Sequence, residues 1–208
     1  MLSTAQPLKT KESSIAIIIL AAGASTRMGR PKQLLEYKGR SLIQHAVEVA
    51  TASCHPIFVV LGAYAEQIKP EIATQSVEVI ENSLWHQGMS TSIRIGIETL
   101  MRSDSKAKAA ILMLCDQPFV SPSLIEQLIK VYRTTCAPIV ASEYTQILGV
   151  PALFAQTLFP QLTTLSSDGG ARQIIQKYIR QVARVSFPKG IIDLDTPQDY
   201  SSLLKIVI

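Results

Sequence analysis

The sequence predicts an α/β fold, a three-layer sandwich in which helices cover both faces of a mostly parallel sheet. Three continuous apolar runs, "IAIIILA" at 15–21, "PIFVVLG" at 56–62 and "AAILMLC" at 109–115, are typical of strands buried on both faces. Segments with helical spacing alternate with these runs, and that alternation favours parallel strands. The 208 residues are 47% hydrophobic, without a long linker or an internal repeat. We therefore expect one domain at 15–208, preceded by a disordered polar tail at 1–14.

The elements follow one another in a regular order. In the first half we expect a strand at 15–21, a helix at 41–52, a strand at 56–62, a helix at 64–74, a short strand at 77–81 and a helix at 89–103. In the second half we expect a strand at 109–115, a helix that Ser121 caps and Pro122 begins, and a strand at 137–142. The alternation is less regular over 149–154. A helix at 169–179, a strand at 181–187 and a last helix from Thr196 complete the chain.

The composition excludes several classes of protein. The net charge is +4, yet Lys and Arg are scattered, aromatic residues make up 6% and there is a single Trp. A nucleic-acid partner is therefore not expected, and a local anion site is favoured instead. The apolar run near the start is too short to span a membrane, so we expect no membrane partner. Cys54, Cys115 and Cys136 are widely spaced and fit buried thiols in a cytoplasmic protein.

The first strand leads into a cationic loop. The stretch "LAAGASTRMGRPK" at 20–32 contains two glycines, the cations Arg27, Arg30 and Lys32, and no acid. Ligands of such sheets bind beyond the carboxyl ends of the strands, and a glycine-containing loop there can offer backbone N–H groups to phosphates. The spacing matches neither a P-loop nor a dinucleotide fingerprint.

Carboxylates complete this edge of the sheet. Asp116 ends the strand at 109–115, and Asp193 and Asp195 flank Leu194 in "IIDLDTPQD". Asp116 could instead cap a turn near Pro118, whereas Asp199 is interpreted as the capping partner of Thr196. A cationic loop with two separated carboxylates describes a metal–triphosphate site. We expect Asp116 and Asp195 to hold Mg²⁺, with Asp193 as the alternative second ligand. His45, His55 and His86 are isolated in sequence, and none is assigned a catalytic role.

A family resemblance rests on several collinear motifs between residues 15 and 204. They are "LAAGASTRMGRPKQLL", "NSLWHQGMSTSIRIGI", "LCDQP", "GVPALF", "SDGGAR" and "DLDTPQD". Together they resemble the MobA-like nucleotidyltransferases, and more narrowly the molybdenum cofactor cytidylyltransferases. The resemblance implies a glycosyltransferase-A-like, Rossmann-like nucleotide-binding domain. It also implies transfer of CMP from CTP to the terminal phosphate of molybdopterin, release of pyrophosphate, and a molybdoenzyme as recipient.

The resemblance also implies roles for individual residues. Backbone groups of Ala21, Ala22, Gly23 and Ala24 would contact the nucleotide, and Lys32, Arg27 and Asp116 would be catalytic. Gly88 and Ser92 would contact the base and Asn82 the sugar, although Ser92 could simply lie in a first helical turn and Asn82 could end a strand. Gly149, Pro151, Asp168 and Arg172 would lie on the acceptor side, where Asp168 could equally cap a helix. Val150 and Ser167 depart there from the family pattern, so acceptor identity is the least specific implication.

Three other functions stay open. The chain could be a guanylyltransferase acting on the same cofactor, or a cytidylyltransferase with a different phosphate acceptor. It could also be a non-catalytic carrier or chaperone for molybdopterin. The "AAG" in the loop favours cytosine within the resemblance, and the presence of Lys32, Asp116 and Asp195 favours an enzyme over a carrier.

Overall fold

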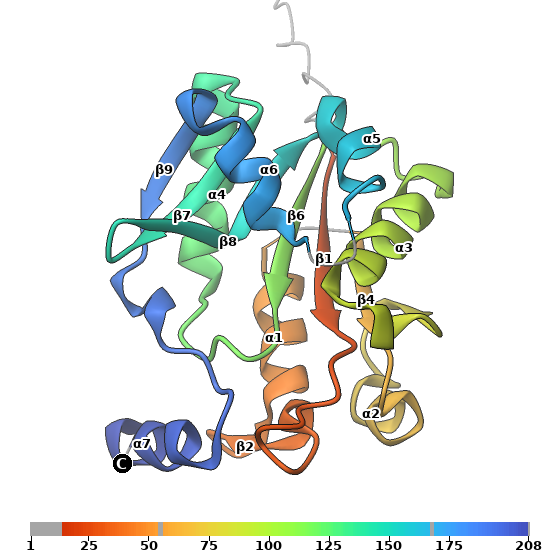
Figure 1. The fold of residues 1–208 in the computed structure, drawn as a ribbon, viewed down its shortest axis with the longest axis vertical. Coiled ribbons are helices and arrows are strands. Elements are labelled where there is room, and N and C mark those ends of the chain that lie inside the picture. Colours follow the sequence, from red (N-terminus) through yellow and green to blue (C-terminus); the bar gives the residue numbers. More distant parts are fainter. Residues whose placement is uncertain (1–13, 54–55, 167–168, 208) are drawn as a thin grey trace, which may run out of the picture.

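The computed structural model describes residues 14–53, 56–166 and 169–207. Seven strands form one twisted sheet (Figure 1): β1 Ile15–Ala21, β4 Ile57–Leu61, β5 Glu78–Glu81, β6 Ala109–Leu114, β7 Ile139–Tyr144, β8 Ile147–Ala155 and β9 Val182–Ser186. Their spatial order is β5-β4-β1-β6-β8-β7-β9. The pairs β5·β4, β4·β1, β1·β6 and β7·β9 are parallel, and only β8 runs antiparallel to its neighbours. The predicted mostly parallel α/β sandwich is therefore confirmed.

Helices cover both faces of the sheet. They are α1 Leu42–Thr51, α2 Ala65–Ile72, α3 Met89–Arg102, α4 Pro122–Thr135, the short α5 Phe159–Leu162, α6 Ala171–Lys177 and α7 Pro197–Val207. Buried residues of α1, α2 and α4 pack in one cluster, and those of α3, α5 and α6 pack in another. Strand β1 contributes alternate residues to the two clusters, for example Ile17 to the first and Ile18 to the second. This division explains why the strand is apolar at every position.

The region with irregular alternation, 149–154, is an element that the sequence pattern did not predict. It belongs to β8, which forms a hairpin with β7 and inserts between β7 and β6. The turn residues Thr145 and Gln146 both have positive φ, at 47° and 65°. Two-residue hairpin turns of this kind usually contain Asn or Gly, so the sequence carries no clear turn signal here.

Short elements at the carboxyl edge of the sheet support the loop after β1. Strands β2 Glu36–Tyr37 and β3 Arg40–Ser41 form a small hairpin, and α7 lies beside it (Figure 1). A third apolar cluster, formed by Met28, Leu35, Tyr37, Leu42, Leu194 and Leu203, joins the loop, the hairpin and α7. Short 3₁₀ turns at Lys32–Leu34, Trp85–Gln87, Gln156–Leu158, Ile179–Gln181 and Pro188–Ile191 complete the described chain.

Several predictions concern residues outside the described ranges. These are the predicted tail, apart from Ser14, and the residues Cys54, His55, Ser167 and Asp168. In the described part of the chain, no helix combines the length and the apolar character needed to cross a membrane.

Candidate nucleotide-binding site

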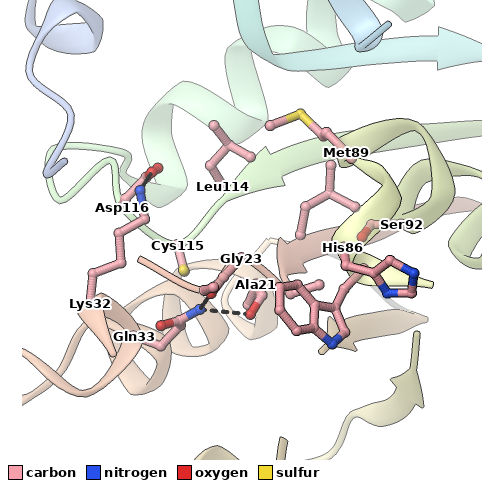
Figure 2. A pocket seen from close by; sticks show the side chains of 15 residues that line it. Ala21, Gly23, Lys32, Gln33, His86, Met89, Ser92, Leu114, Cys115 and Asp116 are labelled. Carbon is pink, nitrogen blue, oxygen red and sulfur yellow. Dashed lines mark hydrogen bonds and ion pairs between the residues drawn. The ribbon is translucent and has the colours of Figure 1, made fainter. Parts of the chain in front are cut away.

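A pocket of about 320 Å³ opens at the carboxyl ends of β1 and β6 (Figure 2). Residues from three parts of the chain line it: Leu20, Ala21, Ala22, Gly23, Ala24, Lys32 and Gln33; Trp85, His86, Gly88, Met89 and Ser92; and Leu114, Cys115 and Asp116. The volume lies in the range of small-molecule sites. The predicted loop and the end of the fourth predicted strand therefore do meet at one cavity.

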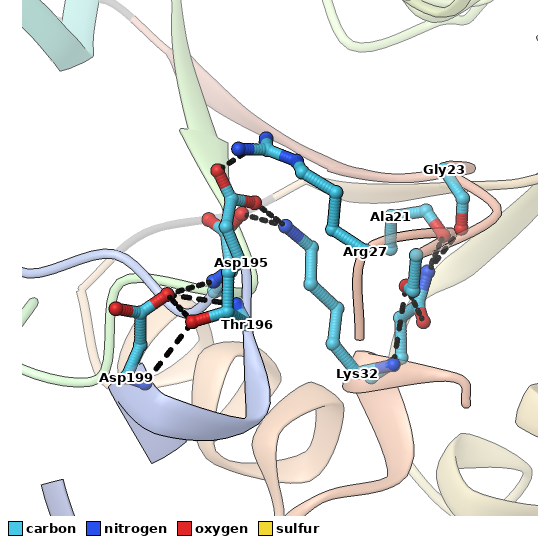
Figure 3. A network of polar contacts seen from close by, with 10 residues as sticks. Ala21, Gly23, Arg27, Lys32, Asp195, Thr196 and Asp199 are labelled. Atoms are coloured by element: carbon cyan, nitrogen blue, oxygen red, sulfur yellow. Dashed lines mark hydrogen bonds and ion pairs between the residues drawn. The ribbon is translucent and has the colours of Figure 1, made fainter. Parts of the chain in front are cut away.

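Lys32 lies at the charged end of this pocket, between two carboxylates (Figure 3). Its Nζ is 2.8 Å from Asp195 Oδ1, and it is 2.5 Å from Asp116 Oδ2 (Figure 2). Burial alone lowers the pKa of Lys32, but the two carboxylates outweigh it, so the pKa is raised overall and the ammonium stays charged. The sequence predicted that these residues share a site. It did not predict that Lys32 contacts both carboxylates.

Arg27 adds a second cation at the mouth of the site. Its Nη2 lies 2.6 Å from Asp195 Oδ2, and its side chain is 70% exposed. Burial acts to raise the pKa of Asp195, but Lys32 and Arg27 lower it further than burial raises it, so the carboxylate is ionised at neutral pH. Because Arg27 is exposed and its ion pair with Asp195 lies at the surface, the side chain can turn toward an anionic ligand at little cost. Arg30 is also exposed and lies over the ring of Tyr200.

Asp195 is held in place by the start of α7. The Asp199 carboxylate accepts hydrogen bonds from the backbone N–H groups of Asp195 and Thr196, at 3.2 and 2.7 Å. Thr196 Oγ1 in turn accepts a bond from the Asp199 N–H at 3.2 Å. This reciprocal arrangement is the capping interaction that the sequence predicted for Thr196 and Asp199. Leu194, between the two candidate ligands, is fully buried, and its N–H donates to the Asp116 carbonyl at 3.1 Å.

The two carboxylates fit a divalent cation. Asp116 is only 8% exposed, and its Oδ1 is buried without a hydrogen-bond partner, which leaves one oxygen available for coordination. Over the described ranges, no three His, Cys, Asp or Glu side chains are grouped around one point. That donor set suits Mg²⁺, which takes one or two carboxylates and completes its shell with phosphate oxygens and water.

Asp193, the alternative ligand, lies in a different environment. It is exposed, and its pKa is raised, first by partial burial of the carboxyl and then by the nearby Asp195 and Asp116. Of the two aspartates that flank Leu194, Asp195 is the one that contacts Lys32. The geometry favours Asp195 as the second ligand.

Asn82 supports the pocket and does not line it. It is 3% exposed, and its Nδ2 donates to Thr91 Oγ1 at 2.8 Å and to Ser92 Oγ at 2.9 Å. Its Oδ1 accepts a bond from the Leu84 N–H at 3.0 Å. These bonds engage both amide hydrogens, so the second alternative, a residue that ends a strand, describes Asn82 better than a sugar contact does. The sequence pattern did not distinguish the two because burial of an Asn leaves no signal.

Ser92 and Gly88 both line the pocket, and both also lie at the start of α3. Ser92 is in the first turn of α3 and also lines the pocket. Gly88 precedes α3 with φ of +106°, a conformation that favours glycine, and it lines the pocket as well. Trp85, His86 and Met89 form the rest of this wall, and Gln33 lies beneath the loop. Sequence reasoning missed these four residues as site residues.

The predicted acceptor residues lie apart from the pocket lining. Arg172 is exposed in the first turn of α6, and Gly149 and Pro151 are buried in β8. The phenol of Tyr144 covers Gly149 so closely that a Cβ there would lie 2.1 Å from the Tyr144 hydroxyl oxygen. The pKa of Tyr144 is raised, first by burial of the phenol and then by Asp193 and Asp116, whereas Arg172 acts to lower it.

Comparison with known proteins identifies the family of the chain. The profile of the MobA-like NTP transferase domain matches residues 17–183. A nicotine blue oxidoreductase from Paenarthrobacter nicotinovorans is 31% identical over 169 residues, covering 77% of this chain and 80% of the relative. The molybdenum cofactor cytidylyltransferase of Escherichia coli is 24% identical, covering 90% and 94%. A probable molybdenum cofactor guanylyltransferase of Mycobacterium avium is 30% identical, covering 77% and 78%.

Solved structures share the fold. Rv0371c from Mycobacterium tuberculosis superposes with a TM-score of 0.80 at 29% identity, covering 93% of this chain and 98% of that one, and it has also been solved in complex with manganese. The 4-diphosphocytidyl-2C-methyl-D-erythritol synthase of Anaerococcus prevotii superposes with a TM-score of 0.74 at 16% identity, covering 93% and 96%. The predicted nucleotidyltransferase-type fold is thereby confirmed.

Proposed function

Because the chain belongs to the MobA-like NTP transferase family, we propose that it transfers CMP from CTP to the terminal phosphate of molybdopterin and releases pyrophosphate. The observation that carries this proposal is the group of four charged side chains, Arg27, Lys32, Asp116 and Asp195, beside a pocket of nucleotide-compatible size. A protein that only carries a cofactor has no need for that arrangement.

Transfer of a nucleotidyl group depends mainly on position and on charge neutralisation. In the proposed reaction an oxygen of the acceptor phosphate attacks the α-phosphorus of CTP, and the bond from that phosphorus to the oxygen of pyrophosphate breaks. The acceptor phosphate is already an anion near neutral pH, so no side chain has to remove a proton. The proposal therefore gives no role as base or nucleophile to His86 or Cys115, although both line the pocket.

The cations act on the leaving group. Backbone N–H groups of the loop, residues 21–24, would receive the phosphates, and Lys32 and Arg27 would stabilise the charge that grows on pyrophosphate. Asp116 and Asp195 would hold Mg²⁺, which neutralises phosphate charge when it is bound. The carboxylates of Asp116 and Asp195 keep Lys32 charged against the effect of burial, and the hydrogen bonds to them hold its ammonium in one position before the substrate arrives. This reduces the reorganisation needed in the transition state.

The proposal also names the residues that would select the cytosine base and the acceptor. Gly88 and Ser92 lie on the wall where the base would bind, and the region around Arg172 and Tyr144 offers a cation and a hydroxyl to the acceptor. We propose that the product passes to a molybdoenzyme in the cytoplasm.

Two relatives supply competing functions. The mycobacterial relative favours GTP as an alternative donor, and the Paenarthrobacter relative favours a reduction reaction. The deciding experiment measures pyrophosphate release with each of the four nucleoside triphosphates, with and without molybdopterin, and measures NADH and NADPH oxidation in parallel.

We expect pyrophosphate release that requires CTP, Mg²⁺ and molybdopterin together. Faster release with GTP would make the protein a guanylyltransferase, and release with another phosphate monoester alone would change the acceptor. Molybdopterin binding without any turnover would favour a carrier. Oxidation of reduced nicotinamide without pyrophosphate release would rule out the transferase.

A further inference from the structure

A buried glutamine lies directly beneath the loop at 21–27. Gln33 is 1% exposed and belongs to the 3₁₀ turn that also contains Lys32. Its Nε2 donates to the Ala21 carbonyl at 2.8 Å and to the Gly23 carbonyl at 3.0 Å (Figure 2). Its Oε1 accepts a bond from Ser25 Oγ at 3.4 Å. Every one of these side-chain contacts is made to the same short loop.

Ser25 is the second observation. It has φ of +52°, a left-handed conformation that a serine adopts only when its surroundings impose it. Its hydroxyl contacts Gln33 and accepts a bond from the Lys32 N–H at 3.2 Å, and its carbonyl accepts bonds from the N–H groups of Met28 and Gly29. The turn at 32–34 therefore fixes the strained point of the loop.

The hydrogen bonds of Gln33 determine what the loop presents to a ligand. In a trans peptide the C=O and the following N–H point in opposite directions, so a carbonyl held by Gln33 leaves the next N–H facing away from it. In the described chain, the N–H groups of Gly23, Ala24, Ser25 and Thr26 donate to no protein acceptor. Consecutive free N–H groups form a concave site for an anion, whereas carbonyls turned into the pocket would repel phosphate.

We propose that Gln33 is a positioning residue: it sets the loop at 21–27 in its phosphate-binding conformation before any nucleotide arrives. The same turn places Lys32, so one element positions both the backbone donors and the catalytic cation. The inference rests on the proposed function only in requiring that the loop binds a polyphosphate.

The test compares three variants in the intact chain. Gln33→Leu keeps the approximate volume and removes every hydrogen bond of the amide, while Gln33→Glu keeps an acceptor for Ser25 and removes the amide donors. Gln44→Leu is the matched control. Gln44 also donates from its Nε2 to a carbonyl, that of Glu71 at 3.1 Å, but it lies on α1 and does not line the pocket.

Two readouts separate positioning from simple stability. In the free protein, trypsin can cut after Arg27 and after Lys32 but not between Arg30 and Pro31. The rate of cleavage at Arg27 alone, followed by the mass of its fragments, therefore reports the order of the loop. In the liganded protein, calorimetry measures binding of Mg²⁺–tripolyphosphate. We expect both Gln33 variants to be cut about tenfold faster and to bind about tenfold more weakly than the wild type, because a preorganised loop loses less entropy on binding. Gln44→Leu should stay within about twofold of the wild type in both readouts.

Either folded Gln33 variant decides the matter. Cleavage and binding that stay close to wild-type values, with only a lower urea midpoint, would mean that Gln33 is an ordinary core residue and would overturn the proposal. If the variants behave as expected while no preparation releases pyrophosphate, the proposed function fails and the role of Gln33 stands. If the wild type transfers CMP while both variants bind tripolyphosphate normally, the proposed function stands and the role of Gln33 fails.

Discussion

Removing the ammonium group of Lys32 should change two measurable properties in opposite directions. In Lys32→Ala the turnover of CTP should fall, because the charge that stabilises departing pyrophosphate is gone. Affinity of the nucleotide-free protein for Mn²⁺ should rise, because the ammonium no longer occupies the space between Asp116 and Asp195. A solvated surface lysine would produce neither effect.

The magnitude follows from the burial of the three side chains. Loss of one preorganised stabilising donor lowers kcat by about 10²–10³-fold, equivalent to about 3–4 kcal/mol of barrier. Deleting one partner of a fully buried ion pair costs about 3–5 kcal/mol of stability. The side chains of Lys32, Asp116 and Asp195 are 16%, 11% and 27% exposed. Because these side chains are only partly buried, we expect Lys32→Ala to lower the free energy of unfolding by somewhat less than that range, about 2–3 kcal/mol.

The assay separates these contributions. A CTP titration of pyrophosphate release gives kcat and KM, urea unfolding gives stability, and calorimetry gives Mn²⁺ affinity. Lys69→Ala is the matched control, because Lys69 also contacts two carboxylates, those of Glu66 and Glu81, but on the surface away from the pocket. The control should leave turnover and Mn²⁺ affinity unchanged. A pure KM effect in Lys32→Ala would mean uniform ground-state binding, and the leaving-group role would then be wrong.

Three further predictions follow from the site and its supports. Asp116→Ala should abolish Mg²⁺-dependent pyrophosphate release in a folded protein, and Asp195→Ala should reduce it far more than Asp193→Ala; the opposite order of the last two would make Asp193 the second ligand. The pKa of Asp195 is lowered in the folded state, so its contribution to stability is complete above the ordinary carboxyl value of 3.8 and is lost as the pH falls through the lowered pKa. Urea midpoints from pH 6 down to about pH 2 should therefore decline more steeply in the wild type than in Asp195→Asn, and parallel curves would contradict the shift. Ser41 accepts a bond from the Gln44 N–H and caps α1, so Ser41→Ala should lower the free energy of unfolding by about 1 kcal/mol without changing turnover; a large loss of turnover would tie this cap to the site.

Much of the fold could be predicted because its signals are local. Continuous apolar runs indicate β1, β4 and β6 whatever packs on them, and Ser121 with Pro122 marks the start of α4 through backbone chemistry alone. The position of Asp116 follows from where β6 ends. The hairpin of β7 and β8 escaped prediction because Thr145 and Gln146 adopt their turn under tertiary constraint and not by preference.

The charged residues that meet at the site could be named from the sequence, but their contacts and part of the pocket lining could not. Lys32, Asp116 and Asp195 could be proposed together because each follows a strand or precedes a helix at the same edge. Which atoms meet depends on side-chain directions that spacing does not determine, so the double contact of Lys32 was not foreseen. Gln33 and Asn82 are polar residues whose burial serves neighbouring loops, and no periodicity distinguishes them from surface amides.

The ion pairs of Asp195 with Arg27 and Lys32 join residues 168 and 163 positions apart. The charged group of the site can therefore be completed only after most of the chain has been synthesised. During synthesis, Lys32 and Asp116 are complete well before residue 195 leaves the ribosome, and a nascent chain therefore has the loop without its second carboxylate. The same holds in reverse on heating. Asp195 is held by the packing of Leu194 and α7 and does not belong to a strand of the sheet. Its ion pairs with Arg27 and Lys32 can therefore open while β1, β4 and β6 stay paired. Activity should then disappear at a lower temperature than secondary structure. The difference between the two transition temperatures would measure the local stability of the Asp195 ion pairs relative to that of the sheet.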